Sequence, residues 1–219
     1  MRYPDIVSLG GNCQVKEAFL KWQKTLPDFS RDSLHHPGNH LFDWTITGPW
    51  ELIKLLKNDF SGIFEKGSIV AKDETDGRMN FVKDTGSGIL FHHLFTRNND
   101  WTDQATVDAE FDDRAVKVAY LVEKMRAVMN SEHLINFIYR GDIEAVGAEH
   151  MIAALDYRRA GRPYTLTNVT YGEPGYDPAA ISDKLRTSIL PADNSWHLDS
   201  WSPVFESICR ENESLLKPA

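Results

Sequence analysis

The feature that most constrains the fold is an almost unbroken apolar run over residues 134–139, LINFIY. Such a run is typical of a parallel strand that is covered on both faces, because both sets of alternating side chains then meet a packing layer. A helix is expected next, capped by Asp142 and ended by Gly161, and residues 164–171 are rich in the Thr and Val typical of a strand. Strand, helix and strand in this order predict a βαβ unit with a right-handed crossover.

The start of the chain indicates a second unit of the same kind. Residues 6–9 form a short apolar run, Gly10 and Gly11 allow a tight turn, and apolar residues then recur at helical spacing from Val15 to Trp22. Further helices are expected over residues 49–58, 112–130 and 202–216.

The middle of the chain is predicted to interrupt this pattern. Residues 25–48 show no clear period and indicate a long structured loop. Short β-prone runs at residues 68–71, 79–82 and 89–95 indicate a small antiparallel excursion or a set of ordered loops. The prediction is therefore one three-layer α/β domain over residues 1–219, Rossmann-like with a mostly parallel sheet, and with a loop/β section inserted around residues 60–98.

Charge and hydropathy exclude several classes of function. With 24 Lys+Arg against 32 Asp+Glu and no basic run, the chain does not fit a protein that neutralises nucleic-acid phosphates or an anionic membrane surface. The longest uncharged stretch, residues 85–96, is shorter than the roughly 20 residues that span a bilayer. Pro4 and Asp5 stand where a secretory signal has an apolar run, so we expect a cytoplasmic protein.

The two cysteines, Cys13 and Cys209, are too few for a disulfide framework. Cys13 follows a predicted strand at the start of a helix, where the amide-rich helix end favours a thiolate. Gly11, Asn12 and Gln14 surround it as candidate donors to an oxyanion. The alternative is a thiol packed as a small apolar residue, which is the interpretation we favour for Cys209.

A nucleophilic thiol needs a base, and histidine is the usual one. His92 and His93 are adjacent in an uncharged β-prone run, so one is expected to face a site and the other solvent. His197 is a further candidate, with Asp199 close enough in sequence to orient it. We expect structural roles for the remaining well-placed histidines, His133 and His150.

Other polar residues are candidates for binding. Asp43 and Trp44 lie in an apolar stretch, where a buried carboxylate needs a partner: it orients a histidine or holds a loop. Arg140 follows the apolar strand and either binds an anionic ligand group or pairs with an acid such as Asp142. His36 and His40 are four residues apart, but Pro37 and Gly38 lie between them and no HExxH glutamate is present, so no metal site is predicted.

The chain contains four short motifs, in the order VSLGGNC, LFDW, FHHLF and FIYR, at residues 7–13, 41–44, 91–95 and 137–140. In order and spacing they resemble a bacterial family of unknown function described as papain-like cysteine peptidases. The resemblance implies Cys13 as nucleophile, and it aligns the family's Phe-Asp-Trp with residues 42–44 and its His-Asp-Phe with residues 93–95. Leu94 departs from the acidic residue of that pattern, which leaves Asp43 to orient His93.

The string GNCQ at residues 11–14 also resembles the opening motif of capsule-polysaccharide proteins regarded as acetyltransferases. More distantly, it is similar to the nucleophile turn of SGNH-type esterases. Both resemblances imply a three-layer α/β fold, SGNH-like, with the nucleophile after the first strand.

The leading hypothesis is a cysteine-dependent hydrolase in which Cys13 attacks an acyl, amide or thioester carbonyl of a peptide or small molecule. His93 is the preferred base and Asp43 its orienting group, with His92, His197 and Asp199 as alternatives. One rival is an acyltransferase in surface-polysaccharide biosynthesis, for which a CoA-type donor is the conceivable cofactor. The other is a non-catalytic module that binds an anion such as a nucleotide or sugar phosphate. The sequence leaves the oligomeric state open.

Overall fold

The computed structural model describes residues 5–11, 13–25, 40–72, 81–96, 102–191 and 198–215. Its larger sheet contains β1 (Asp5–Ser8), β6 (Ile135–Arg140), β7 (Tyr164–Thr170) and β8 (Leu185–Ile189). The strands are parallel and lie in the order β1-β6-β7-β8. The parallel sheet predicted from the apolar run is therefore confirmed.

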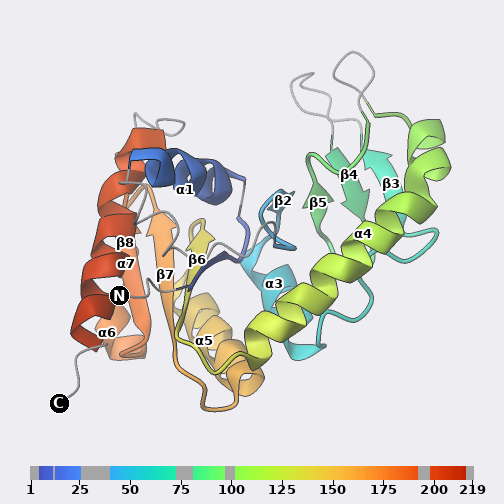
Figure 1. Ribbon diagram of the computed structural model, residues 1–219. Coiled ribbons are helices and arrows are strands. Elements are labelled where there is room, and N and C mark those ends of the chain that lie inside the picture. The colour runs from blue at the N-terminus through green and yellow to red at the C-terminus, as the bar shows by residue number, and fades with distance from the viewer. Residues whose placement is uncertain are drawn as a thin grey trace.

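Helices cover both faces of this sheet, which gives three layers (Figure 1). On one face, Ile6, Ile138 and Val169 pack with α1 (Gln14–Thr25) and α7 (Ser202–Leu215), the latter preceded by the 3-10 helix η2 (Leu198–Trp201). On the other face, the alternate strand residues pack with α3 (Pro49–Lys57) and α5 (Ala145–Arg159). Alternation of apolar side chains along each strand thus supplies both packing layers.

The inserted section folds into a second sheet. Its strands are β2 (Thr45–Ile46), β3 (Ile69–Lys72), β4 (Phe81–Asp84) and β5 (Leu90–Phe91), antiparallel in the order β2-β5-β4-β3. The predicted β section is confirmed, although β2 lies inside the stretch expected to be a loop. Two residues are too few to show a period of two, so β2 left no signal in the sequence.

The buried side chain of Asp84 holds the turns of this second sheet together. Its carboxylate accepts hydrogen bonds from the backbone N–H groups of Phe64 at 2.9 Å and Gly86 at 3.0 Å. The hydroxyls of Ser68 and Ser87 donate to it at 2.7 and 2.6 Å. The chain therefore enters β5, and the histidines after it, from a fixed turn.

Two helix starts differ from the prediction, and two elements were not predicted. The long helix α4 (Gln104–Asn130) begins at Gln104 and not at residue 112, because the Asp103 side chain accepts from the N–H of Thr106 at 2.7 Å and caps it there. Helix α5 begins at Ala145, and the expected cap, Asp142, instead accepts from the Thr170 hydroxyl at 2.6 Å. The short helix α6 (Pro178–Ile181) and strand β8 were missed, because β8 is polar and lies at the sheet edge.

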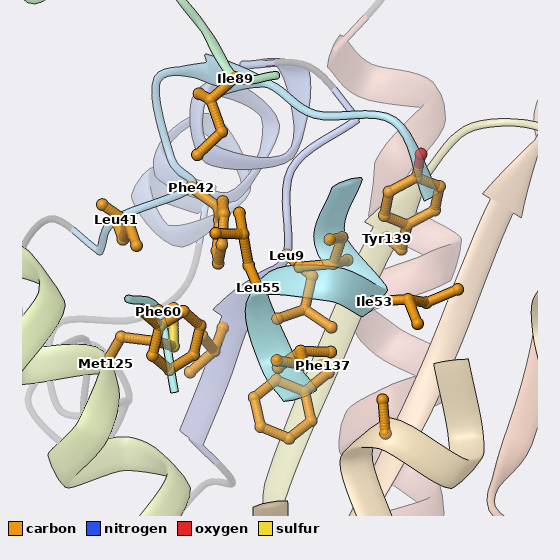
Figure 2. Close-up of a cluster of buried hydrophobic side chains, with 14 of the residues drawn as sticks. Leu9, Leu41, Phe42, Ile53, Leu55, Phe60, Ile89, Met125, Phe137 and Tyr139 are labelled. Carbon is orange, nitrogen blue, oxygen red and sulfur yellow. The ribbon is translucent and has the colours of Figure 1, made fainter. Parts of the chain in front are cut away.

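The two sheets share one hydrophobic core. Figure 2 shows Leu9, which follows β1, near Phe137 of β6 and Leu55 of α3. Phe42, from the turn before β2, and Met125 of α4 belong to the same cluster. The inserted section is thus attached to the parallel sheet through buried apolar contacts. Within the described ranges, no helix combines the length and apolarity that crossing a bilayer requires.

The chain leaves the carboxyl ends of the neighbouring strands β1 and β6 in opposite directions. The helix that follows β1 packs on one face of the sheet and the helix that follows β6 packs on the other, so the two chains diverge at this point. Ligands of α/β proteins collect at such points of divergence. Gly11 lines this end so closely that a Cβ built there would lie 1.6 Å from the carbonyl oxygen of Arg140.

We predict that Gly11→Ala destabilises the protein by several kcal/mol more than Gly161→Ala. Both glycines have positive φ, +87° and +86°, and share a strain of about 1–2 kcal/mol for a side chain. Only Gly11 faces a backbone atom, since no atom lies within 4 Å of a Cβ at Gly161. Urea unfolding of the two variants measures the difference, and equal midpoints would contradict the close approach.

Candidate active site

Cys13 lies at the first residue before α1. The chain leaves β1 along β6, where the N–H of Leu9 donates to Ile138 at 2.8 Å and that of Arg140 donates to Gly10 at 3.3 Å. Gly10 and Gly11, at φ +93° and +87°, then turn the backbone. The carbonyl of Cys13 accepts the first helical hydrogen bond, from Glu17 at 3.2 Å. The thiol is therefore held at the amide end of a 12-residue helix, in a residue that is buried at 5% exposure.

The imidazole of His92 lies against this thiol. The distance from Cys13 Sγ to His92 Nδ1 is 3.9 Å, within reach of a hydrogen bond to sulfur. The backbone N–H of His92 donates to the carbonyl of Trp44 at 3.2 Å, and the His92 ring packs 5.1 Å from the ring of Phe81. His92, which follows a strand of the second sheet, thus contacts Cys13, which follows a strand of the first sheet.

His93, the base preferred from the sequence, lies directly beside His92. The two ring centroids are 4.0 Å apart, and the His93 ring meets that of Trp44 edge-on at 5.4 Å. One ligand atom from each of Cys13, His92 and His93 lies within 4.8 Å of the others. A bend after β5 replaces the extended backbone that would have turned the two histidines to opposite sides.

Asp43 pairs with a lysine that the sequence analysis did not identify. Its Oδ2 lies 3.2 Å from Nζ of Lys16 and accepts from the backbone N–H of His40 at 2.7 Å. The two charged side chains are only 4% and 3% exposed. These contacts hold the turn of residues 40–44 against α1. Of the two roles considered for Asp43, orienting a histidine or holding a loop, they correspond to the second. Burial raises the pKa of Asp43, and the nearby Lys16 opposes that rise.

The sequence does contain a signal for this role of Lys16, because a lysine stands within the apolar face of the predicted helix. It follows Val15 and precedes Ala18 and Phe19 in the buried stripe of α1. A cation in such a stripe requires an anionic partner, and Asp43 in its own apolar stretch requires a cation. Matching these two requirements would have predicted the ion pair.

Arg140 lies at the same end of the sheet, over an aromatic ring. Its guanidinium carbon is 4.3 Å from the ring centroid of Tyr171, and the Tyr171 hydroxyl donates to Oε1 of Gln14 at 3.2 Å. In the described part of the chain Arg140 forms no ion pair, not even with Asp142. Arginines that do pair with acids there are Arg114, Arg126, Arg158, Arg162 and Arg186. Tyr171 was missed, although it follows the strand next to that of Arg140.

The remaining sequence candidates are distributed as follows. Asn12, His36 and His197 lie outside the described residues. Asp199 is exposed and pairs with Lys21 at 2.8 Å. Cys209 belongs to α7 and packs at the edge of the core, as expected of a structural cysteine.

The histidines with expected structural roles lie away from Cys13. His133 is exposed in the turn before β6, where its carbonyl accepts from Arg159 at 2.8 Å. His150 is exposed on α5, with its ring 5.5 Å from that of Trp50.

Comparison of the chain with protein-family models, with curated proteins and with solved structures finds no match. The candidate site therefore rests on its own geometry and on the motifs of the sequence.

We predict that Lys16→Met destabilises the protein by about 3–5 kcal/mol near pH 8, because a buried carboxylate loses its cation. The loss shrinks toward pH 5. Burial raises the pKa of Asp43 and Lys16 opposes that rise, so removal of Lys16 raises the pKa further. The folded variant then keeps a proton that its unfolded chain has released, and its stability falls as pH rises through that window. Urea unfolding at both pH values measures the effect.

Lys21→Met is the matched control on the same helix. Its ion pair with Asp199 is exposed, with side chains 48% and 76% accessible, so little change is expected at either pH. A loss in Lys16→Met that is the same at pH 5 and pH 8 would contradict the role of the Asp43 charge.

Proposed function

We propose that the protein is a cysteine-dependent acyl hydrolase in which Cys13 is the nucleophile and His92 the base. The observation that carries the proposal is the 3.9 Å contact between Cys13 Sγ and His92 Nδ1 at the start of α1. A thiolate is favoured there because the positive end of the helix dipole stabilises negative charge and the imidazole accepts the proton. The contact moves the role of base from His93, preferred from the sequence, to its neighbour.

In the first step the Cys13 proton passes to His92 Nδ1, and the sulfur attacks the carbonyl carbon of the substrate. The backbone N–H groups at the start of α1 have no carbonyl partner within the helix and can donate to the oxyanion that forms. Collapse of the intermediate breaks the bond to the leaving group, which takes the proton from His92. The product of this step is a thioester on Cys13.

In the second step a water molecule gives a proton to His92 and attacks the thioester, which releases the acid and restores the thiol. An alcohol or amine in place of that water would make the protein an acyltransferase, with the same residues and a CoA-type donor. The motif resemblance to papain-like cysteine peptidases supports an amide substrate, and the resemblance to acetyltransferases supports an acyl acceptor on a sugar. We place the reaction in the cytoplasm.

We predict that p-nitrophenyl acetate acetylates Cys13 and that Cys13→Ala abolishes the added mass. His92→Ala should slow acetylation by about 10²–10⁴-fold, the usual contribution of a general base. Mass spectrometry of the intact protein and of its peptides measures both effects.

Cys209→Ala is the control, since that thiol packs against the core from α7, and this variant should be acetylated at the wild-type rate. A fall in both cysteine variants would indicate loss of structure. An alkylation rate at Cys13 that rises only near pH 8.5, the ordinary thiol range, would contradict an activated nucleophile.

The position of Arg140 favours a ligand that carries an anionic group. It is half-buried, lies over the ring of Tyr171 and forms no ion pair with a described acid, so its guanidinium can bind an anionic ligand group at this end of the sheet. The same observation favours the second candidate function, a non-catalytic module that binds an anion. In the hydrolase, Arg140 would select acyl donors that carry a carboxylate or phosphate.

We predict that Arg140→Met lowers kcat/KM for the p-nitrophenyl monoester of succinate by about 10- to 100-fold, the value of one or two charge-assisted hydrogen bonds. The neutral acetate ester should be cleaved as by the wild type. Equal losses on the two esters would contradict the role in charge recognition. Phosphate binding in calorimetry without any Cys13 acetylation would favour the binding module.

A further inference from the structure

We propose that Cys13, His92 and His93 together bind one Zn²⁺ ion. The sequence predicts no metal site here, because Cys13 and the two histidines are far apart in the chain. The fold nevertheless brings one sulfur and two imidazole nitrogens within 4.8 Å of one another. Thiolate and imidazole are the ligands that zinc prefers in proteins.

The dimensions of the cluster fit a tetrahedral ion after a small adjustment. With Zn–S near 2.3 Å and Zn–N near 2.0 Å, ligand atoms of a tetrahedral site lie about 3.3–3.6 Å apart. The Cys13 Sγ to His92 Nδ1 distance is 3.9 Å, so this edge of the tetrahedron is almost formed. His93 is exposed and lies beyond the end of β5, so its side chain can turn inward to close the remaining edges.

The ligands come from anchored backbone, as a metal site requires. The carbonyl of Cys13 accepts the first hydrogen bond of α1, and the N–H of His92 donates to Trp44. The Trp44 ring meets His93 edge-on and limits the positions of that imidazole. These contacts hold the backbone of Cys13 and His92 and the ring of His93 in place.

The ligand set also indicates the class of metal. The cluster contains no carboxylate, whereas Mg²⁺ and Ca²⁺ take oxygen ligands. Three protein ligands leave a fourth position for water. Bound zinc occupies the Cys13 sulfur and a ring nitrogen of His92, and the thiol proton is released to solvent. If the proposed hydrolase is correct, zinc is therefore its reversible inhibitor.

The test uses the full-length chain, freed of metal by a chelator and then titrated with Zn²⁺ against a chromophoric competitor. One equivalent should bind. Co²⁺ should bind in the same place and give the near-ultraviolet charge-transfer absorption of a thiolate ligand. Substoichiometric zinc binding, or a Co²⁺ complex without the thiolate absorption, would overturn the proposal without any substituted protein.

Three substitutions locate the ligands. Cys13→Ser and His93→Ala should each lower zinc affinity by at least about 100-fold, more than the loss of an outer-shell partner costs. His150→Ala removes an exposed histidine of α5 and should leave the affinity unchanged. Wild-type affinity in His93→Ala, with the circular dichroism spectrum of the folded protein, would overturn the three-ligand site.

The acetylation assay on metal-free protein keeps this proposal separate from the proposed function. Absence of acetylation would remove the hydrolase and leave the zinc site to its own titration. Absence of zinc binding would remove the metal site and leave acetylation intact. Where both are present, Zn²⁺ should suppress acetylation of Cys13, and acetylation that continues at saturating zinc would show that the ion binds elsewhere.

Discussion

The buried ion pair between Lys16 and Asp43 holds the two halves of the candidate site together. Lys16 belongs to the helix that begins after Cys13, and Asp43 to the turn that leads into β2. A charge pair removed from water makes a weak contribution to stability overall, but either partner alone is costly. The pair therefore fixes which surface of the inserted section meets α1, and so which residues face the thiol.

From that contact the geometry follows along the backbone. The turn after Asp43 carries Trp44, whose carbonyl accepts the N–H of His92. On the other side, Gly11 lets the chain pass so close to β6 that only a residue without a side chain fits. The Lys16–Asp43 ion pair fixes the turn before β2, and the missing side chain of Gly11 lets the turn after β1 pack against β6. The Cys13 sulfur and the His92 imidazole lie between these two turns. Neither sheet contains the site by itself.

The sequence predicted the parts of the fold that depend on local pattern. The buried strand at residues 135–140, the helices with a clear apolar stripe and the position of Cys13 all follow from periodicity and chain order. The two-residue strand β2 and the polar edge strand β8 do not, because nothing local distinguishes them from loops. The relation of His92 to Cys13 depends on packing between sheets, and the Lys16–Asp43 pairing depends on it as well.

The proposed nucleophile and its proposed base lie 79 residues apart in the chain, and each follows a strand of a different sheet. A disturbance that shifts the smaller sheet by a few ångströms would part the two atoms while the larger sheet kept its hydrogen bonds. The rate at which a reagent labels the Cys13 sulfur therefore reports on the packing between the two sheets. It would register loosening there well before spectroscopy detected any loss of helix.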